Sequence, residues 1–213
     1  MSDDAGTGQT TQPMEPVAVP ASNATPAQTQ TDEAALMHAV ARGDHGAFRA
    51  LVARHLDPLH SYALRLTGSK SLAEDLLQDI WLTVWQKAER YKPRRGSLST
   101  WLHSLLHNRF VDQQRKRQPH YDTDVVEWAL DSHATDQAGL HVEEAKYLQT
   151  ALQRLPVNQK AALLLAHSQG FSNPEVAGIL GQSVRAVESL QARGRRRLKQ
   201  ELANLSSDHE RQS

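Results

Sequence analysis

The stretch "FSNPEVAGILGQSVRAVESLQARGRRRLK" (171–199) carries the clearest structural signal in the sequence. Ser172 is followed three residues later by Glu175, which is the spacing of a capping box at the start of a helix. Gly181 can supply the left-handed residue that ends this short helix, and Ser183 can cap the next one. Two helices joined by a short turn that contains glycine are typical of a helix-turn-helix.

The second of these helices concentrates positive charge. Residues 183–200 hold five arginines, one lysine and a single glutamate, although the whole chain has a formal net charge of zero. At about 100° per residue, Val187, Leu190, Gly194 and Leu198 face inward. Hydrogen-bonding groups lie early on the outer face and cations lie late, which suits a helix whose first turns enter a major groove while its end contacts phosphates. The outward residues are Arg185, Glu188, Ser189, Ala192, Arg196 and Lys199.

Composition limits the class of protein. The chain has 213 residues, 39% of them apolar and only 5% aromatic, which allows one large domain or two small ones. It has no cysteine, so disulfides and thiolate metal sites are excluded. No apolar run approaches the roughly 20 residues needed to cross a bilayer, and the N-terminus lacks a secretory signal pattern. We therefore expect a soluble, cytoplasmic protein.

Apolar residues recur at helical spacing from Thr31 onward, and no alternating strand pattern persists, so the predicted fold class is all-α. We expect two small helical domains joined by a flexible linker. Thr31 is expected to cap the first helix, and Pro58 to interrupt the second. The boundaries are a disordered tail at 1–30, a first domain at 31–117, a linker at 118–141 with at most a short helix around 125–130, a second domain at 142–205, and a disordered tail at 206–213.

Charge is segregated along the chain. A basic block at 109–117 and the basic helix at 183–199 are separated by an acidic stretch at 122–136. A surface lattice of ion pairs would intersperse the two signs, so two separate basic blocks indicate two contacts with a polyanion.

The predicted helix at 71–91 has apolar residues on the wrong face. Leu82 and Trp85 lie among polar residues on the side opposite the core stripe. A leucine and a tryptophan surrounded by carboxylates are typical of a docking surface for a basic partner. The alternative is that a neighbouring helix covers Trp85.

The predicted helix from Ser99 to Arg117 places His103, His107, Asn108 and Arg115 on its outer face. Such side chains can hydrogen-bond with base edges or hold phosphates. Two alternatives stay open: an ordinary solvated face, and a zinc half-site formed by the histidines of "HSLLH" (103–107). The zinc pattern lacks the glutamate that should follow the first histidine, and no third ligand is evident.

Three segments together resemble a known family. They are "ALRLTGSKSLAEDLLQDIWLTVWQKAERY", "RGSLSTWLHSLLHNRFVDQQRKR" and "LPVNQKAALLLAHSQGFSNPEVAGILGQSVRAVESLQARGRRRL". In order and spacing they resemble the two domains of an extracytoplasmic-function sigma factor, a small (group IV) member of the sigma-70 family of bacterial RNA polymerase subunits. The resemblance covers about residues 33–117 and 142–203, and it implies a sigma factor that is not an enzyme, needs no cofactor and recognises promoter DNA on core RNA polymerase.

The resemblance also implies roles for individual residues. The polymerase contact, on the β′ coiled coil, would comprise Asp75, Gln78, Asp79, Leu82 and Trp85. With the loop at 92–98, the contact to −10 promoter DNA would comprise Trp101, His103, His107, Asn108, Arg109, Arg115, Lys116 and Arg117. The helix that reads the −35 element would use Arg185, Ala186, Glu188, Ser189, Ala192, Arg193, Arg196 and Lys199. An anti-sigma protein is a further expected partner, besides core polymerase with its β subunit.

The chain departs from the family pattern at two places. Gly194 stands where the family usually has alanine, at a cost of about 1 kcal/mol in helix propensity. His103 and His107 are not residues that the family fixes, so the preferred −10 bases cannot be carried over. Two rival functions remain: a helix-turn-helix regulator that never joins polymerase, and a metal-dependent hydrolase that uses the histidines.

Overall fold

The computed structural model describes residues 26–117 and 139–210, and in these ranges every regular element is helical. A first group of helices comprises α1 (Pro26–Ala41), α2 (His45–Thr67), α3 (Lys70–Lys87) and α4 (Leu98–Arg117). Short 3-10 turns at Ala88–Arg90 and Pro93–Arg95 connect α3 to α4. The second group comprises α5 (Gly139–Gln153), α6 (Val157–Leu163), a π-helical turn at Leu164–Ser168, α7 (Asn173–Leu180) and α8 (Val184–Glu210).

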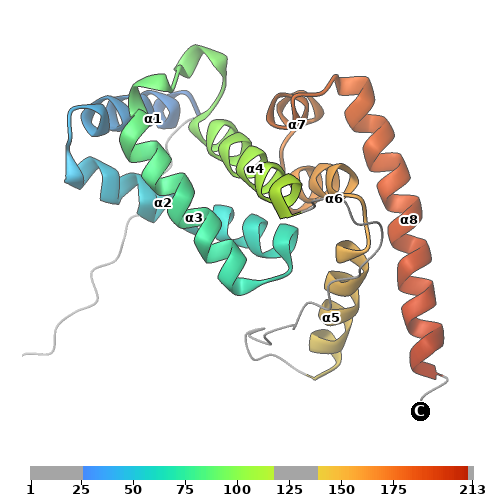
Figure 1. Cartoon of the computed structure of the whole chain (residues 1–213). Helices are drawn as coiled ribbons and strands as arrows, with labels where there is room; N and C mark the ends of the chain where they lie inside the picture. Colours follow the sequence, from blue (N-terminus) through green and yellow to red (C-terminus); the bar gives the residue numbers. More distant parts are fainter. Residues whose placement is uncertain (1–25, 118–138, 211–213) are drawn as a thin grey trace, which may run out of the picture.

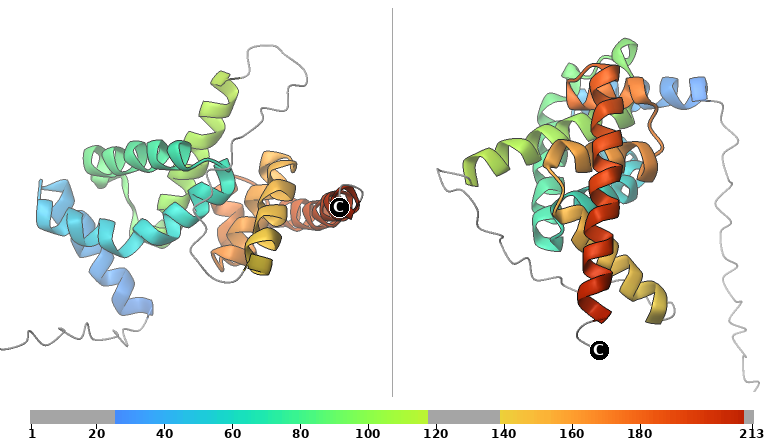
Figure 2. Two further views of the ribbon diagram at one scale, coloured as in Figure 1. Left: turned by 90° about the horizontal axis from the view of Figure 1, so that it is seen from below. Right: turned by 90° about the vertical axis from the view of Figure 1, so that its right-hand side faces the viewer.

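Figure 1 shows the two groups side by side, with the long helix α8 on the outer side of the second group. Seen from below, α5 and α6 lie between α8 and the first group (Figure 2). The groups touch where α4 packs against α7 and where α2 packs against α5 and the π-helical turn. Their buried side chains form one continuous apolar cluster. The all-α prediction with two helical units is confirmed for the described residues.

Local signals place most helix ends. Asp44 caps α2 by accepting hydrogen bonds from the backbone N–H groups of Gly46 and Ala47. Gly68 ends the same helix in the left-handed conformation, with φ 74°. Ser69 caps α3, which ends at Lys87, so the single helix expected at 71–91 is a helix followed by a 3-10 turn.

Two expected helix boundaries in the first group are wrong. Thr31 lies inside α1, which begins at Pro26, a residue well tolerated in the first turn. Pro58 does not interrupt α2, because Leu59 and Tyr62 beyond it are fully buried and that packing outweighs the lost backbone hydrogen bond.

Other expectations concern the ends of the second unit. The last helix continues to Glu210, five residues past the expected end of the second domain at 205. The expected short helix at 125–130 and most of the N-terminal tail lie outside the described residues.

Candidate functional site

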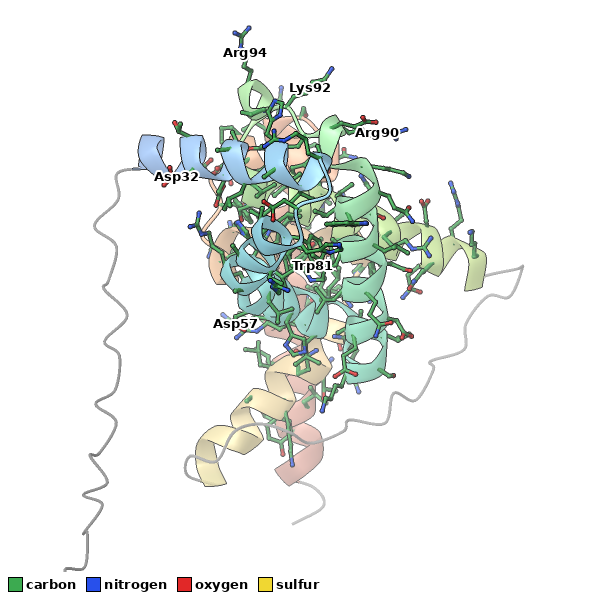
Figure 3. The ribbon with its side chains drawn as sticks, turned by 90° about the vertical axis from the view of Figure 1, so that its left-hand side faces the viewer. Asp32, Asp57, Trp81, Arg90, Lys92 and Arg94 are labelled. Carbon is green, nitrogen blue, oxygen red and sulfur yellow. The ribbon has the colours of Figure 1, made fainter. Side chains whose placement is uncertain are left out.

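The first candidate surface is a groove of about 600 Å³ between α2 and α3. Leu82 is 55% exposed on its rim, with the exposed side chains of Gln78 and Glu74 beside it. Asp75 is also exposed on α3. The sequence pattern missed the side of the groove that α2 supplies, which is formed by Phe48, Leu56 and His60. It also missed Trp81, which Figure 3 shows in this part of the molecule.

Trp85 has a mixed environment. The His45 ring stacks on its indole at 4.6 Å between ring centroids, and Phe48 packs edge-on at 5.2 Å. The indole is therefore half-buried by the start of α2 while it still lines the groove. The alternative interpretation, that a neighbouring helix covers Trp85, holds for one side of the ring, and the docking role of Trp85 stays a prediction.

An ion pair joins α3 to α4. Arg109 donates from Nε and from Nη2 to one carboxylate oxygen of Asp79, at 2.8 and 2.7 Å. The sequence assigned Asp79 to the polymerase contact and Arg109 to the DNA contact. The structure brings these two residues together, so each helps to position the helix of the other.

The expectation that His103 and His107 lie on an exposed face of α4 is wrong. They are 1% and 4% exposed, on a helix that packs both against the first group and against α7. The His103 ring lies between Tyr62 of α2, at 5.3 Å, and Phe171 before α7, at 4.8 Å. Burial lowers the pKa of both histidines, for His107 to about 4, so both are neutral near pH 7.

The second candidate surface is a hollow of about 350 Å³ at the start of α4. Tyr91 and Trp101 form its aromatic wall, with ring centroids 5.6 Å apart. Ser97 and Thr100 add hydroxyl groups, which hydrogen-bond to each other at 2.8 Å. Bases can stack on such rings and hydrogen-bond with such hydroxyls. The sequence identified the loop and Trp101 but missed Tyr91, whose aromatic character just before the basic loop was the available signal.

Cations surround this hollow. Arg90 and Lys92 line it, and Figure 3 shows them with Arg94 at one end of the first group of helices. Farther along α4, Asn108 and Lys116 are exposed, and Arg115 pairs with Asp112 at 3.1 Å. The Arg117 side chain lies outside the described set.

The third candidate surface is the helix-turn-helix of α7 and α8, and its local geometry confirms the sequence prediction. The Glu175 carboxylate accepts a hydrogen bond from the Ser172 backbone N–H at 2.9 Å, completing the capping box. Gly181 is left-handed, with φ 62°. Gln191 of α8 donates to the Asn173 side chain at 2.9 Å in a part-buried position, which fixes the two helices relative to each other.

The predicted outward face of α8 is exposed along its length. Only Ala186 is partly covered, while the seven other predicted residues are open: Arg185, Glu188, Ser189, Ala192, Arg193, Arg196 and Lys199. Gly194 lies on the inner side, where an added Cβ would approach Leu163 Cδ1 to 3.0 Å and the Gln159 carbonyl oxygen to 3.3 Å. Close packing of α6 on α8 therefore accounts for glycine at this position.

The described part of the chain has neither a cluster of metal ligands nor a membrane-spanning helix. Within residues 26–117 and 139–210, no three His, Cys, Asp or Glu side chains are grouped so that they could hold a metal ion. None of the helices described here is long and apolar enough to span a membrane.

The three surfaces define a helical protein that has an exposed apolar groove, an aromatic hollow with basic residues around it, and a basic helix-turn-helix. Comparison with protein families agrees: Sigma-70 region 2 matches residues 51–120, and Sigma-70, region 4 matches residues 145–198. The chain is 33% identical over 178 residues to the ECF RNA polymerase sigma factor SigM of Mycobacterium tuberculosis, covering 84% of this chain and 88% of that protein. It is 32% identical over 164 residues to the ECF RNA polymerase sigma factor RpoE of Cereibacter sphaeroides, covering 75% and 89%.

Solved structures agree as well. CnrH in complex with the cytosolic domain of CnrY matches with a TM-score of 0.61 and 27% identity, covering 83% of this chain and 98% of that one. The sigma factor RpoE in complex with the anti-sigma factor NepR from Bartonella quintana matches with a TM-score of 0.60 and 27% identity, covering 73% and 96%. This chain belongs to the extracytoplasmic-function sigma factors of the sigma-70 family, which direct transcription initiation.

Proposed function

We propose that this protein joins core RNA polymerase and directs it to promoters that carry matching −10 and −35 elements. The observation that carries the proposal is the presence, on one chain, of an exposed apolar groove, a basic aromatic hollow and a basic helix-turn-helix. A regulator that never joins polymerase would use the helix-turn-helix but would leave the groove around Leu82 without a role. The protein acts by binding, with no catalytic step and no cofactor.

Polymerase docking is assigned to the groove between α2 and α3. The exposed side chain of Leu82 and the open side of Trp85 supply the apolar contact, and Asp75 and Gln78 supply a polar rim. The partner surface is the β′ coiled coil expected from the family resemblance. Asp79 acts indirectly, through its ion pair with Arg109.

DNA recognition is assigned to the other two surfaces. Unpaired −10 bases enter the hollow beside Tyr91 and Trp101, where stacking and the nearby cations hold them. The exposed early turns of α8 read the −35 duplex, and Arg196 and Lys199 contact its phosphates. We assign −10 recognition to residues 31–117 and −35 recognition to residues 142–205.

A protein inhibitor is a further proposed partner. Its support is that the solved relatives were captured with the cytosolic domain of CnrY and with the anti-sigma factor NepR. The site of action is the cytoplasm, because core polymerase and promoter DNA are found there in bacteria.

The test uses Leu82→Ala, which removes an exposed apolar contact without touching the core. Affinity for core polymerase should fall by about tenfold, since a central interface residue is worth 1 kcal/mol or more. Transcription from a promoter library should fall with it. Leu148→Ala is the matched control, because Leu148 is 42% exposed on α5. Equal affinities for the two variants would refute the docking assignment, and a wild-type protein that never binds core polymerase would refute the function.

A further inference from the structure

A hollow of about 360 Å³ lies between α6 and α8, which pack against each other (Figure 1). It shares no lining residue with the groove of α2 and α3 or with the hollow at the start of α4, so it is a separate feature. Only charged and amide side chains line it: Gln159, Arg193, Arg196, Arg197, Gln200 and Glu201. Such a lining favours a charged ligand over an apolar one.

Positive charge exceeds negative charge in this hollow. Three arginines line it, against the single carboxylate of Glu201. That carboxylate is already shared by two arginines, because one oxygen accepts from Arg154 Nη1 at 3.4 Å and the other pairs with Arg197 Nε at 3.7 Å. The hollow therefore holds cationic groups whose charge the protein itself does not balance, and an anionic ligand would supply the missing charge.

Hydrogen-bond donors in the hollow are available to such a ligand. Arg193 donates from Nε to the Ser189 carbonyl oxygen at 3.3 Å, which orients its guanidinium and leaves the two terminal nitrogens without a partner among the described residues. Arg196 forms no hydrogen bond or ion pair within the same ranges. Gln159 has a buried Oε1 that is unpartnered there, so its amide is free to turn the NH₂ group toward an anion. Guanidinium groups match the oxygens of a phosphoryl group in paired hydrogen bonds.

The hollow opens on a different side of α8 from the residues assigned to base reading. At about 100° per residue, Arg193 and Arg197 lie roughly a quarter turn around the helix from Arg185. Arg197 is also about 18 Å farther along the helix axis, which exceeds the major-groove width of about 12 Å. When the first turns of α8 enter the groove, the hollow therefore lies beside it, where a phosphate backbone runs and no base edge is within reach.

We propose that the hollow between α6 and α8 is a binding site for a phosphoryl anion, held by its three arginines and by the Gln159 amide. Two sources of this chemistry fit the hollow: a backbone phosphate of the duplex beside the −35 element, and a free polyphosphate. The first source rests on the proposed function, whereas the anion chemistry of the hollow does not. The site adds Gln159 and Arg197, which lie outside the face of α8 assigned to the −35 element.

The first arm of the test titrates the full chain with inorganic tripolyphosphate by isothermal titration calorimetry. Arg197→Gln should weaken binding by about tenfold, because it removes one charge-assisted contact. Gln159→Glu should weaken it at least as much, because it keeps the size of the side chain and places a second carboxylate in the hollow. Arg195→Gln is the matched control: it removes the same charge from an exposed position on α8 that does not line the hollow, and it should bind as the wild type does.

The second arm measures binding to a randomised −35 duplex with flanking base pairs. Arg197→Gln and Gln159→Glu should weaken binding about equally for all sequences, and Arg197→Gln should reduce the slope of log affinity against log salt by about one unit. Asn204→Asp, which adds the same charge as Gln159→Glu at an exposed position of α8 outside the hollow, should have no effect.

The two arms together decide both the site and its ligand. A loss of affinity in the first arm alone identifies a free polyphosphate, a loss in the second arm alone identifies DNA, and either result upholds the site. No loss in either arm overturns it. If the wild type binds tripolyphosphate through the hollow but binds no duplex, the anion site stands and the proposed function fails. Arg197→Gln changes an exposed side chain, so it decides the question even if Gln159→Glu unfolds the chain.

Discussion

Gly194 sets how closely α6 and α8 approach. Replacing it with alanine would gain about 1 kcal/mol of helix propensity. The new methyl group, however, would meet the buried Leu163 side chain at 3.0 Å and the Gln159 backbone at 3.3 Å. Overpacking a tight contact costs about 1–3 kcal/mol, so we expect Gly194→Ala to lower the free energy of unfolding by about 1 kcal/mol. Thermal unfolding measures the change.

Gly178 offers the matched control, because it lies inside α7 with no atom within 4 Å of an added Cβ. Gly178→Ala should therefore raise the unfolding temperature through helix propensity alone. A stabilising effect at both glycines would show that α6 yields without cost, and the close-packing explanation of Gly194 would be wrong.

Single residues whose role is local were the easiest to predict from sequence. The helix caps act within one turn of their own position, so the sequence spacing is enough to predict them; they are Asp44, Gly181 and the Ser172–Glu175 pair. Leu82 was also placed correctly, since its exposure depends on one helix face. Asp79 pairs with Arg109 of α4, and Trp85 stacks with His45 of α2. Neither contact could be predicted from the local sequence around Asp79 or Trp85.

Helix α4 shows why one helix cannot be assigned from its own periodicity. It packs on the first group and also against α7, and its buried His103 ring lies between Tyr62 of α2 and Phe171 before α7. Periodicity separates a buried face from a polar one, but histidine is polar enough to be counted as exposed while its ring packs well against Phe171. Periodicity therefore assigns a solvent face to a helix that is in fact packed between two layers.

The face of α8 predicts two distinct kinds of DNA-binding defect. Arg196→Ala should weaken binding to many −35 sequences about equally and reduce the slope of log affinity against log salt by about one unit, through one fewer released counterion. Glu188→Ala should instead change the preferred sequence, by about 1–3 kcal/mol at one base pair, with little change in the slope.

Competition binding of the full chain to a randomised −35 duplex at several salt concentrations distinguishes these defects. Both side chains are exposed, so neither change should alter folding. If Arg196→Ala altered sequence preference while Glu188→Ala did not, α8 would face the groove with a different side and the assignment of its residues would have to be redrawn.

The packing of the two domains against each other could not be predicted from the sequence. The chain's two helical units and their order follow from periodicity and caps, but the contact between them uses the Arg65 backbone carbonyl, a group that every residue possesses. The other contributor, Phe171, is one aromatic residue in a loop. Contacts of this kind carry no spacing rule, so only the folded structure identifies them.

Burial of His107 makes the stability of the molecule depend on pH. The ring is 4% exposed, and its Nδ1 has no hydrogen-bond partner. Burial lowers the pKa of His107 from 6.5 to about 4. Between these values the unfolded chain binds the proton and the folded chain does not, so the free energy of unfolding falls as the pH falls. The loss from this one group amounts to about 3 kcal/mol at the lower end.

His107→Leu removes the titrating group and keeps the site apolar, so its unfolding temperature should fall less than that of the wild type between pH 6.5 and pH 4. At the upper end the variant should be at least as stable as the wild type, because an unpaired buried nitrogen is replaced by a methyl-bearing side chain. His167→Leu is the control, since it makes the same change at an exposed histidine. Unfolding followed by circular dichroism across this range gives the comparison. Parallel curves for wild type and His107→Leu would mean that the His107 ring takes up its proton in the folded chain at no cost in stability, and would contradict this prediction.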